Sequence, residues 1–568
     1  MNSEDLVSVV DLGIAFERDG NIKQAVEKST FRVKRGKTLA IVGESGSGKS
    51  VSSLSLMALL HPTKTVFTSG TFHFHSDVLS ATGGDNSIGP KHAVLKELRG
   101  RKIAMIFQEP MTSLNPVMTC GRQVSEVLEK HLGIPREKAR ARTLELFEEV
   151  KLPRAATMLD QYPHQLSGGQ RQRVMIALAI ACEPLLLIAD EPTTALDVTV
   201  QRDILLLLKA IQNKRGMSMI FITHDLGVVE EIADDVVVMK QGKIIEQGSV
   251  LEVLNNPQDP YTRGLLQCRP DANQKLFRLL TVADFESTAQ PTRLLRSDSS
   301  ENRGVFLSVD SLCKRYDSAG LFKRKNTPVV AVDRVSFTIQ RGETLGLVGE
   351  SGCGKTTLSR MLLGLIPSTS GKIEYHFSGG TATQLTQLAP QALRRLRKEI
   401  QIIFQDPYSA LNPKHTIGNA LTEPMLVHGI GSSEAERKAM AIALLEKVGL
   451  SGEHYSRYPH EFSGGQRQRI VIARALACKP SFIICDESVS ALDVSVQAQV
   501  LNLLNDLKAE YNLTYLFISH DLRVVHYMSD RIMVMRKGCI EEIGEANTVF
   551  NHPTSDYTRQ LLDAIPGK

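Results

Sequence analysis

The sequence contains a long internal repeat, and this repeat limits the possible folds more than any other feature. The block that begins at Gly43 returns at Gly349. The blocks that begin at Ser167, Asp190 and His224 return at 463, 486 and 520, each 296 positions later. Solenoid repeats have periods of roughly 20–50 residues, far shorter than this one. The chain therefore consists of two copies of one domain, each about 265 residues long.

The ends of the two copies define the predicted domain boundaries. The pattern Tyr-Thr-Arg-x-Leu-Leu begins at Tyr261 in the first copy and at Tyr557 in the second. We therefore predict a first domain over residues 1–266, a linker over 267–304 and a second domain over 305–568. The latter part of the predicted linker is polar and has no sustained apolar period.

Composition and charge exclude several classes of protein. Hydrophobic residues make up 42% of the chain and charged residues 23%, as in soluble globular proteins. No run approaches the roughly 18 uncharged apolar residues of a membrane-spanning helix, and the polar, acidic start does not resemble a secretory signal. The net charge is +5, and a pI near 8.6 falls short of the strongly basic footprint expected of a dedicated nucleic-acid binder. The eight cysteines form no C-x-x-C pair, which fits a reducing cytoplasm.

Hydrophobic periodicity predicts an alternation of strands and helices in each copy. In the first copy, residues 38–42 predict a strand, and residues 51–60 predict a helix after a glycine-rich loop. The apolar runs 185–189 and 219–223 predict buried strands. Residues 121–152 are rich in Glu, Lys, Arg and Leu at helical spacing and predict a helical insert. This alternation indicates a mainly parallel sheet.

A glycine-rich loop of the form G-x-x-x-x-G-K-S/T occurs in each copy, at Gly43–Ser50 and at Gly349–Thr356. Its glycines allow backbone N–H groups to converge on phosphate oxygens at a helix N-terminus. The lysine would neutralise the β- and γ-phosphates, and the hydroxyl that follows would bind Mg²⁺. These residues are Lys49, Ser50, Lys355 and Thr356. Two matches at equivalent positions, each after a predicted strand, weigh against a chance glycine turn.

Two carboxylates follow a predicted buried strand in each copy, Asp190 and Glu191 in the first and Asp486 and Glu487 in the second. The aspartate can orient Mg²⁺ through water, and the glutamate can polarise the water that attacks the γ-phosphate. Adjacent carboxylates can also be only a solvated strand end. Their repetition beside a phosphate-binding loop favours the catalytic interpretation.

A histidine follows another predicted strand in each copy and precedes Asp-Leu, at His224 and at His520. A single histidine is more often structural than catalytic. The equivalent placement of the two favours a contact with the γ-phosphate.

A third pair of motifs resembles a known family. Ser167–Gln170 and Ser463–Gln466 both read Ser-Gly-Gly-Gln, are followed by Arg-Gln-Arg, and lie about twenty residues before the Asp-Glu pair. They resemble the signature of ATP-binding cassette (ABC) ATPases. Gln108 and Gln405, each in Phe-Gln-Glu/Asp-Pro, resemble the Q-loop of that family.

Further positions extend the resemblance over nearly the whole chain. The segments Thr194–Asp197 and Ser490–Asp493 resemble the D-loop of ABC ATPases. Phe16 and Tyr316 lie where the family stacks an aromatic ring on adenine. As a physical signal, a single aromatic residue at the end of a strand is weak, and an ordinary surface role is the alternative.

The resemblance implies an α/β fold with two tandem nucleotide-binding domains. Each would have a RecA-like, mostly parallel sheet, an antiparallel β part and a helical signature subdomain. It also implies two ATP sites between the domains of one chain, arranged head to tail. One site would join Gly43–Ser50 with Ser463–Gln466, and the other would join Gly349–Thr356 with Ser167–Gln170. ATP could then hold the two halves together, and hydrolysis could release them.

The resemblance also assigns roles to individual residues. Catalysis is assigned to Glu191, Glu487, His224 and His520. Mg²⁺ binding is assigned to Ser50, Gln108, Asp190, Thr356, Gln405 and Asp486. Contacts with ATP are assigned to Phe16, Gly43, Ser45, Gly46, Gly48, Lys49, Ser50, Val51, Gln108, Ser167, Gly168, Gly169, Gln170, Tyr316, Gly349, Ser351, Gly352, Gly354, Lys355, Thr356, Thr357, Gln405, Ser463, Gly464, Gly465 and Gln466. One departure is Cys353, which replaces the Ser47 of the first loop; it is either a small loop residue or a thiol that alkylation could reach.

The segments after the two Q-loop glutamines, 108–116 and 405–413, and the Tyr-Thr-Arg tails resemble the oligopeptide/dipeptide branch of ABC importers. This implies an ATPase motor for uptake of peptides or peptide-like compounds such as glutathione. The implied partners are two integral-membrane permease subunits and an extracytoplasmic substrate-binding protein, with this chain on the cytoplasmic face of the inner membrane and no nucleic-acid partner.

The alternative is a soluble tandem-cassette ATPase that acts on ribosomes or nucleic acid. Ribosome-acting members usually have a long, charged helical linker, and DNA-repair members have zinc cysteines, neither of which this sequence shows. Selectivity in the importer family lies in the permease and binding protein, so this sequence leaves the solute open among peptides, nickel and sugar-linked compounds.

Overall fold

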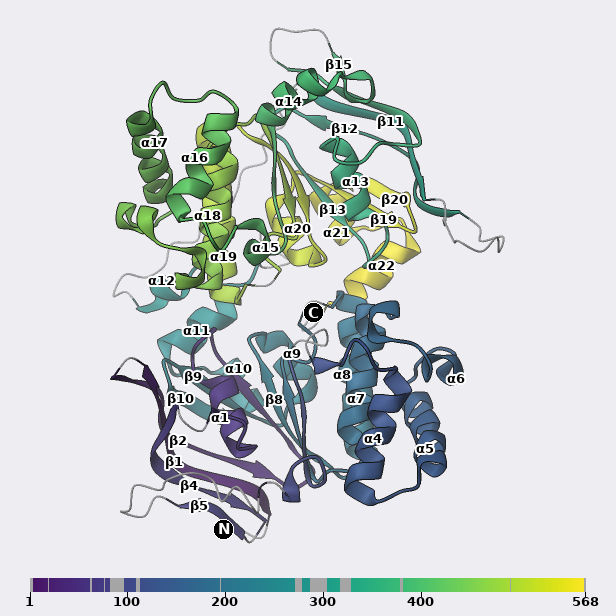
Figure 1. Cartoon of the computed structure of the whole chain (residues 1–568), viewed down its shortest axis with the longest axis vertical. Helices are drawn as coiled ribbons and strands as arrows, with labels where there is room; N and C mark the ends of the chain where they lie inside the picture. Colours follow the sequence, from purple (N-terminus) through teal and green to yellow (C-terminus); the bar gives the residue numbers. More distant parts are fainter. Residues whose placement is uncertain are drawn as a thin grey trace.

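The structure is a computed structural model that shows two domains, one above the other along the long axis (Figure 1). It describes residues 4–18, 20–61, 64–75, 77–81, 95, 97–108, 113–194, 196–270, 278–286, 304–316, 328–377, 382–490 and 492–565. The first domain forms the lower half in this view and the second the upper half, and the C-terminal helix α22 (Asp556–Asp563) lies near their boundary.

A six-stranded sheet forms the centre of the first domain. Its strand order is β10 (Lys243–Ser249), β9 (Asp235–Lys240), β3 (Thr38–Val42), β8 (Ser218–Thr223), β7 (Leu186–Asp190) and β6 (Ile103–Ile106). All neighbours pair in parallel except β10, which runs antiparallel to β9. Every residue of β3, β7 and β8 is buried, as expected for parallel strands covered on both faces. The prediction of a mainly parallel sheet is confirmed.

An antiparallel sheet covers one side of this core. Its order is β2 (Asn21–Lys34), β1 (Asp5–Arg18), β4 (Thr65–Phe74) and β5 (Asp77–Ala81). Val9 and Phe72 of this sheet belong to the same buried cluster as Ile41 and Ile188 of the central sheet. The two sheets therefore share one hydrophobic core.

Helices cover the remaining faces of the first domain. They are α1 (Lys49–Leu56), α4 (Cys120–Leu132), α5 (Arg136–Glu149), α6 (Ala155–Met158), α7 (Gly168–Ile180), α8 (Val198–Arg215), α9 (Leu226–Ile232), α10 (Val250–Asn255), α11 (Pro260–Gln267) and α12 (Val282–Glu286). The predicted helical insert consists of two helices, α4 and α5. Gly133 ends α4 with a φ of 65°, and Pro135 precedes α5, which is the usual placement of glycine after a helix and proline before one.

The second domain repeats this arrangement. Its antiparallel sheet has the order β12 (Val329–Gln340), β11 (Val305–Tyr316), β14 (Ser370–Tyr375) and β15 (Thr383–Gln384). Its central sheet has the order β16 (Ile400–Ile403), β17 (Phe482–Asp486), β18 (Thr514–Ile518), β13 (Thr344–Val348), β19 (Arg531–Arg536) and β20 (Cys539–Glu545). The strand order matches that of the first domain, as the sequence repeat predicts.

Most helices of the second domain have a counterpart in the described part of the first. The second domain contains α13 (Lys355–Leu362), α14 (Pro390–Glu399), α15 (Pro407–Ala410), α16 (Ile417–Val427), α17 (Glu434–Lys447), α18 (Gly464–Leu476), α19 (Val494–Tyr511), α20 (Leu522–Met528) and α21 (Ala546–Asn551), followed by α22. Across the described ranges, we find no helix whose length and apolar character would let it span a bilayer.

The segment after α11 packs against the second domain. The buried side chain of Asn502 in α19 donates to the carbonyl of Leu279 and accepts from its N–H, both over 2.9 Å. This pair of hydrogen bonds joins a segment of the predicted linker to α19 of the second domain. Much of the predicted linker, 267–304, lies outside the described residues, so the boundaries at 266 and 305 stay predictions.

Candidate functional site

Each glycine-rich loop joins a central strand to a helix, as predicted. In the first domain it connects β3 to α1. Gly43 has a φ of 151°, and a Cβ atom there would overlap the carbonyl oxygen of Met239 at the end of β9. Gly48, the N-cap of α1, has a φ of 100°. Glycine is required at both positions because side chains would meet backbone or force a strained conformation.

The lysine of each loop lies inside it. Lys49 Nζ donates hydrogen bonds to the carbonyls of Gly43 over 2.7 Å and Glu44 over 2.8 Å. Lys355 Nζ does the same in the second domain, over 2.6 Å and 3.0 Å. Burial lowers the pKa of Lys49, although the carboxylates around it act in the opposite direction. A buried ammonium held by backbone carbonyls is suited to bind an anion at the loop.

The predicted metal-binding residues of the first domain meet. Ser50 Oγ donates a hydrogen bond to Asp190 Oδ1 over 3.0 Å. Asp190 ends β7, is 5% exposed, and its burial raises its pKa to about 6. Burial raises the pKa of Asp486 to about 6 as well. Within the described second domain, however, the Thr356 hydroxyl does not donate a hydrogen bond to Asp486.

These oxygen donors fit a magnesium site of the kind that phosphates complete. Mg²⁺ usually takes one or two protein oxygens, water and substrate phosphates as ligands. No three His, Cys, Asp or Glu side chains among the described residues gather closely enough to hold a metal ion by themselves. Ser50 and Asp190 supply the small number of oxygen ligands that such a site needs.

The predicted catalytic residues of the first domain form one cluster. Gln108 Nε2 donates to Glu191 Oε2 over 3.0 Å, and Thr194 Oγ1 donates to the same oxygen over 2.9 Å. His224 Nδ1 lies 3.4 Å from Glu191 Oε1. Burial alone would raise the pKa of Glu191, but His224, Lys49 and Thr194 together lower it to about 2. Glu191 is therefore a carboxylate at neutral pH.

The backbone of this glutamate is unusual. Glu191 has a φ of 46° and Glu487 a φ of 47°, in the left-handed region that non-glycine residues seldom adopt. The N–H of Glu191 donates to the carbonyl of Ile222 over 3.0 Å, and Glu487 pairs likewise with Ile518 over 2.9 Å. Such strain is typical of functional sites, where the surrounding structure maintains it.

The second domain repeats the cluster. Gln405 Nε2 donates to Glu487 Oε2 over 2.7 Å, and His520 Nδ1 lies 3.7 Å from the same oxygen. Burial would raise the pKa of Glu487, but His520 and Lys355 produce a net lowering. Burial would lower the pKa of His520, but Glu487 raises it overall. The histidine and the glutamate thus favour each other's charged form.

Each signature motif forms a capping box at the start of a helix. Ser167 caps α7: its Oγ accepts from Gln170 N–H over 3.3 Å, and Gln170 Oε1 accepts from Ser167 N–H over 3.0 Å. Ser463 and Gln466 repeat the pattern at α18. Ser463 is exposed, so it is accessible to a ligand. The serine and glutamine of the motif therefore build the helix start that presents the two glycines.

The D-loop of the second domain reaches the phosphate-binding loop of the first. Asp493 Oδ2 accepts a hydrogen bond from the backbone N–H of Ser45 over 2.8 Å. Ser495 Oγ also donates to the Glu44 carboxylate.

At the second loop, Cys353 is 5% exposed. Burial raises the pKa of its thiol, and the charge of Asp197 acts in the same direction. This burial argues against alkylation of Cys353, which stays a prediction.

The helix after each glycine-rich loop lies on the same side of the molecule as the signature helix of the other domain (Figure 1). Helices α1 and α18 lie on the left of the molecule, on opposite sides of the boundary between the domains, and α13 and α7 lie on its right half. This places each phosphate-binding loop on the same side as the other domain's signature motif. It supports the predicted head-to-tail pairing, which stays a prediction, as do the site assignments of the individual residues.

Two residues that sequence reasoning missed contact the loops directly. Tyr261 Oη accepts a hydrogen bond from Glu44 N–H over 3.1 Å, and Tyr557 Oη accepts one from Glu350 N–H over 3.2 Å. Both tyrosines begin the Tyr-Thr-Arg tails, which the sequence analysis used for the domain ends and for the resemblance to the importer branch, without a role in the site. Their recurrence in both copies was the available signal.

Phe16 is half-buried and Tyr316 is 44% exposed, and stacking of either on adenine stays a prediction.

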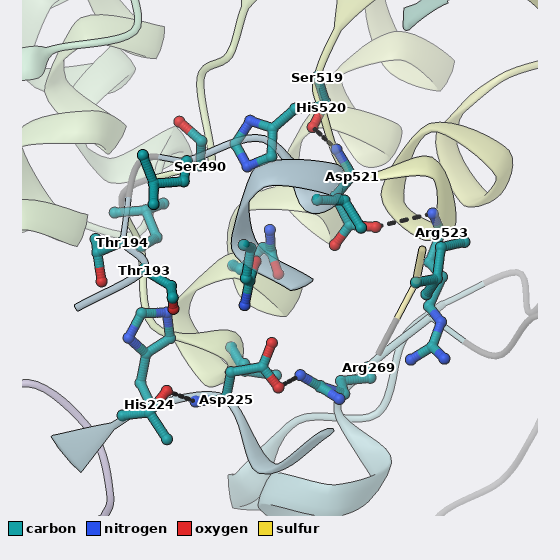
Figure 2. A pocket seen from close by; sticks show the side chains of 18 of the residues that line it. Thr193, Thr194, His224, Asp225, Arg269, Ser490, Ser519, His520, Asp521 and Arg523 are labelled. Carbon is teal, nitrogen blue, oxygen red and sulfur yellow. Dashed lines mark hydrogen bonds and ion pairs between the residues drawn. The ribbon is translucent and has the colours of Figure 1, made fainter. Parts of the chain in front are cut away.

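A cavity of about 120 Å³ lies between the two domains. Figure 2 shows His224 and His520 facing it from opposite domains, each followed by an aspartate. Arg269 and Arg523 lie beside these aspartates. The cavity thus brings together the loops that follow β8 and β18.

Comparison with known proteins identifies the domains. The family model described as "ABC transporter" matches residues 26–194 and 332–490, and "Oligopeptide/dipeptide transporter, C-terminal region" matches residues 245–289. These matches confirm the resemblance to the importer branch and favour it over the ribosome or nucleic-acid alternative.

Full-length relatives agree with the family models. The chain is 47% identical over 569 residues to the glutathione import ATP-binding protein GsiA of Pectobacterium atrosepticum, covering 99% of this chain and 89% of the relative. It is 46% identical to GsiA of Escherichia coli K12 and of Salmonella typhimurium, covering 100% of this chain and 90% of each relative. The chain therefore belongs to the ABC transporter family, as an ATP-binding ATPase subunit of an importer with two tandem ABC domains.

Proposed function

We propose that this chain powers the uptake of glutathione or a similar short peptide by hydrolysing MgATP at two sites, each shared between its two domains. The hydrogen bond from Ser45 N–H to Asp493 carries the shared-site part of the proposal, because it joins the phosphate-binding loop of one domain to the D-loop of the other. The names of the GsiA relatives support glutathione as the solute.

At the first site, the loop Gly43–Ser50 would bind the phosphates with its backbone N–H groups and with Lys49. Ser50 and Asp190 would hold Mg²⁺, which when bound offsets negative charge on the phosphate oxygens. Ser463–Gln466 of the second domain would close the site over the γ-phosphate. The second site would use Gly349–Thr356 and Ser167–Gln170 in the same way.

Glu191 would orient and polarise the attacking water. Its carboxylate is ionised at neutral pH, and Gln108 and Thr194 each donate a hydrogen bond to it. These bonds hold the carboxylate in one place, which is how a protein aligns a nucleophile with the phosphorus. His224, 3.4 Å from the other carboxylate oxygen, would contact the γ-phosphate. Glu487, Gln405 and His520 would act likewise at the second site.

The partners would be two membrane permease subunits and an extracytoplasmic substrate-binding protein, with this chain at the cytoplasmic face of the membrane and without nucleic acid. The segment after Gln405 offers a surface for a permease. Tyr408 in α15 is 64% exposed, and the guanidinium of Arg467 lies 3.6 Å from its ring centroid. Because Arg467 belongs to the signature helix α18, a permease that contacts Tyr408 would be coupled to the signature motif.

The catalytic part of the proposal is tested by the double variant Glu191→Gln, Glu487→Gln. Glutamine keeps the side-chain size but removes the charge that polarises water, so hydrolysis should fall at least about 100-fold while ATP binding persists. The control variant Glu183→Gln, Glu510→Gln changes surface carboxylates and should hydrolyse ATP normally. Near-normal hydrolysis by the Glu191/Glu487 variant would refute the assignment.

The transport part is tested separately. Purification of the tagged chain from native membranes in mild detergent should recover two polytopic membrane proteins, identified by mass spectrometry. The complex, reconstituted in vesicles with its binding protein, should take up glutathione when ATP is supplied. Recovery with ribosomes or DNA would refute the importer role. Uptake of dipeptides or nickel in preference to glutathione would refute only the proposed solute.

A further inference from the structure

The two domains differ at two positions beside the interdomain cavity, and the differences are complementary. The first domain has Gly227 and Arg269, and the second has Arg523 and Ile565 at the positions 296 residues later. Arg269, Arg523 and Ile565 all line the cavity. Each domain therefore contributes one arginine, but from a different element: α20 in the second domain, and the segment after α11 in the first.

Arg269 contacts the residue that follows the catalytic histidine. Its guanidinium forms an ion pair with Asp225 (Figure 2). The same Asp225 oxygen, Oδ1, accepts hydrogen bonds from the N–H groups of Gly227 over 2.8 Å and Val228 over 3.3 Å. Asp225 is thus the N-cap of α9 and sets the direction of the chain immediately after His224. The ion pair with Arg269 holds the Asp225 carboxylate in place and so stabilises this cap.

Glycine at 227 provides the space for Arg269. A Cβ atom at this position would overlap Arg269 Nη1. Gly227 is not among the residues with positive φ, and it lies in the first turn of α9, so its backbone conformation does not require glycine. The second domain has Arg523 at the equivalent helix position, where its N–H donates to Asp521 Oδ1 over 2.9 Å. There, Ile565 takes the place of a second arginine.

The two arginines share one electrostatic environment. Burial and the nearby charge of Arg523 lower the pKa of Arg269 to about 10, while Asp521 acts in the opposite direction. Arg269 therefore remains charged at neutral pH. Two arginines, Arg269 and Arg523, and two carboxylates, Asp225 and Asp521, therefore meet at the cavity.

We infer that Arg269 is a positioning residue for His224. Arg269 lies in the oligopeptide-type C-terminal region, and it provides the first domain with the arginine that the second domain has at Arg523. It would hold the Asp225 cap, and through it the histidine loop of the first ATP site. It would also connect that loop to the segment joining the domains. The inference rests on the proposed role of His224.

The test moves the arginine within the first domain. Arg269→Ile should lower kcat for ATP hydrolysis about tenfold with little change in KM, because a displaced histidine affects the reacting phosphate more than ATP binding. Gly227→Arg combined with Arg269→Ile places the arginine as in the second domain, and it should restore kcat to within about twofold of the parent chain. Arg269→Lys should retain an intermediate kcat, because lysine keeps the charge without the planar fork.

The second domain provides the matched control. Arg523→Gly should lower kcat in the same way, and Arg523→Gly with Ile565→Arg should restore it. Thermal unfolding of each variant separates misfolding from mispositioning. If the Gly227→Arg chain does not fold, Arg523→Gly with and without Ile565→Arg decides the question.

The outcomes distinguish the inference from the proposed function. A parental kcat in Arg269→Ile, or a folded relocation variant no better than Arg269→Ile, would overturn the inference while leaving the catalytic proposal intact. An unchanged kcat in His224→Ala would refute the proposed role of His224, and the inference with it.

Discussion

The hydroxyl of Tyr261 accepts a hydrogen bond from the backbone N–H of Glu44, over 3.1 Å and 217 positions along the chain. Tyr557 and Glu350 repeat this contact in the second domain over 3.2 Å. Lys240 Nζ lies over the Tyr261 ring, 5.0 Å from its centroid, a cation–π contact. The tail of each domain thus contacts the glycine-rich loop, so the domain end adjoins the proposed nucleotide site.

Removing this contact should weaken ATP binding. In the double variant Tyr261→Phe, Tyr557→Phe, one backbone N–H of each loop loses its acceptor. The lost hydrogen bond is worth about 1 kcal/mol, so KM for ATP should rise about fivefold with kcat nearly unchanged. Steady-state kinetics would measure this. Tyr511→Phe, which alters a tyrosine 46% exposed on α19, is the control. An unchanged KM in the double variant would show that the contact does not support binding.

The contact between Asn502 and Leu279 should stabilise the junction of the domains. Asn502→Ala leaves the buried N–H and carbonyl of Leu279 without partners, at a cost of about 2 kcal/mol. We expect a lower thermal midpoint and faster tryptic cleavage after Arg278. Asn505→Ala, which removes a single half-buried hydrogen bond to Tyr527, should have a smaller effect. Equal effects of the two substitutions would contradict a special role for Asn502.

A pH-dependent contribution to stability should come from Glu149. This carboxylate at the end of α5 pairs with Lys214 over 3.0 Å and with Arg215 over 2.6 Å at the end of α8. Burial would raise the pKa of Glu149, but the two cations produce a net lowering. A lowered pKa means that the folded chain binds its proton less tightly than the unfolded chain. The stabilisation is therefore present above the ordinary pKa of 4.5 and is lost as the pH falls below it.

Glu149→Gln should therefore lower the thermal midpoint at pH 7, and the difference from the parent chain should disappear toward pH 3. Thermal unfolding across this range would measure both. Glu145→Gln, a substitution in an exposed ion pair with Arg142, should change little at any pH. A difference between the parent and Glu149→Gln that does not depend on pH would contradict the ion-pair explanation.

Thiol labelling should modify Cys539 first. Cys539 is exposed, whereas the other seven cysteines are buried. Burial raises the pKa of Cys353, and that of Cys485 to about 12, which keeps these thiols protonated and unreactive. Mass spectrometry of the native chain after brief maleimide treatment should show one adduct, which Cys539→Ser removes. Labelling of Cys353 that ATP prevents would contradict its burial.

Local sequence patterns were sufficient for the parts of the fold that depend on neighbouring residues. The run Thr38–Val42, the loop Gly43–Ser50 and helix α1 follow one another as predicted, because apolar periodicity and glycine act over a few positions. Asp190 and Glu191 lie at a strand end for the same reason. The duplicated strand order also follows from the sequence, because two similar sequences bury the same apolar faces.

The sequence by itself determined that the chain has two ABC domains and which motifs each one carries. Tertiary structure alone decided that Asp493 contacts Ser45, 448 positions away, that Tyr261 contacts the loop at Glu44, and that Arg269 pairs with Asp225. The physical reason is that such contacts depend on how completed helices and sheets pack against each other. Apolar spacing specifies which face of an element is buried, but not which distant side chain meets it.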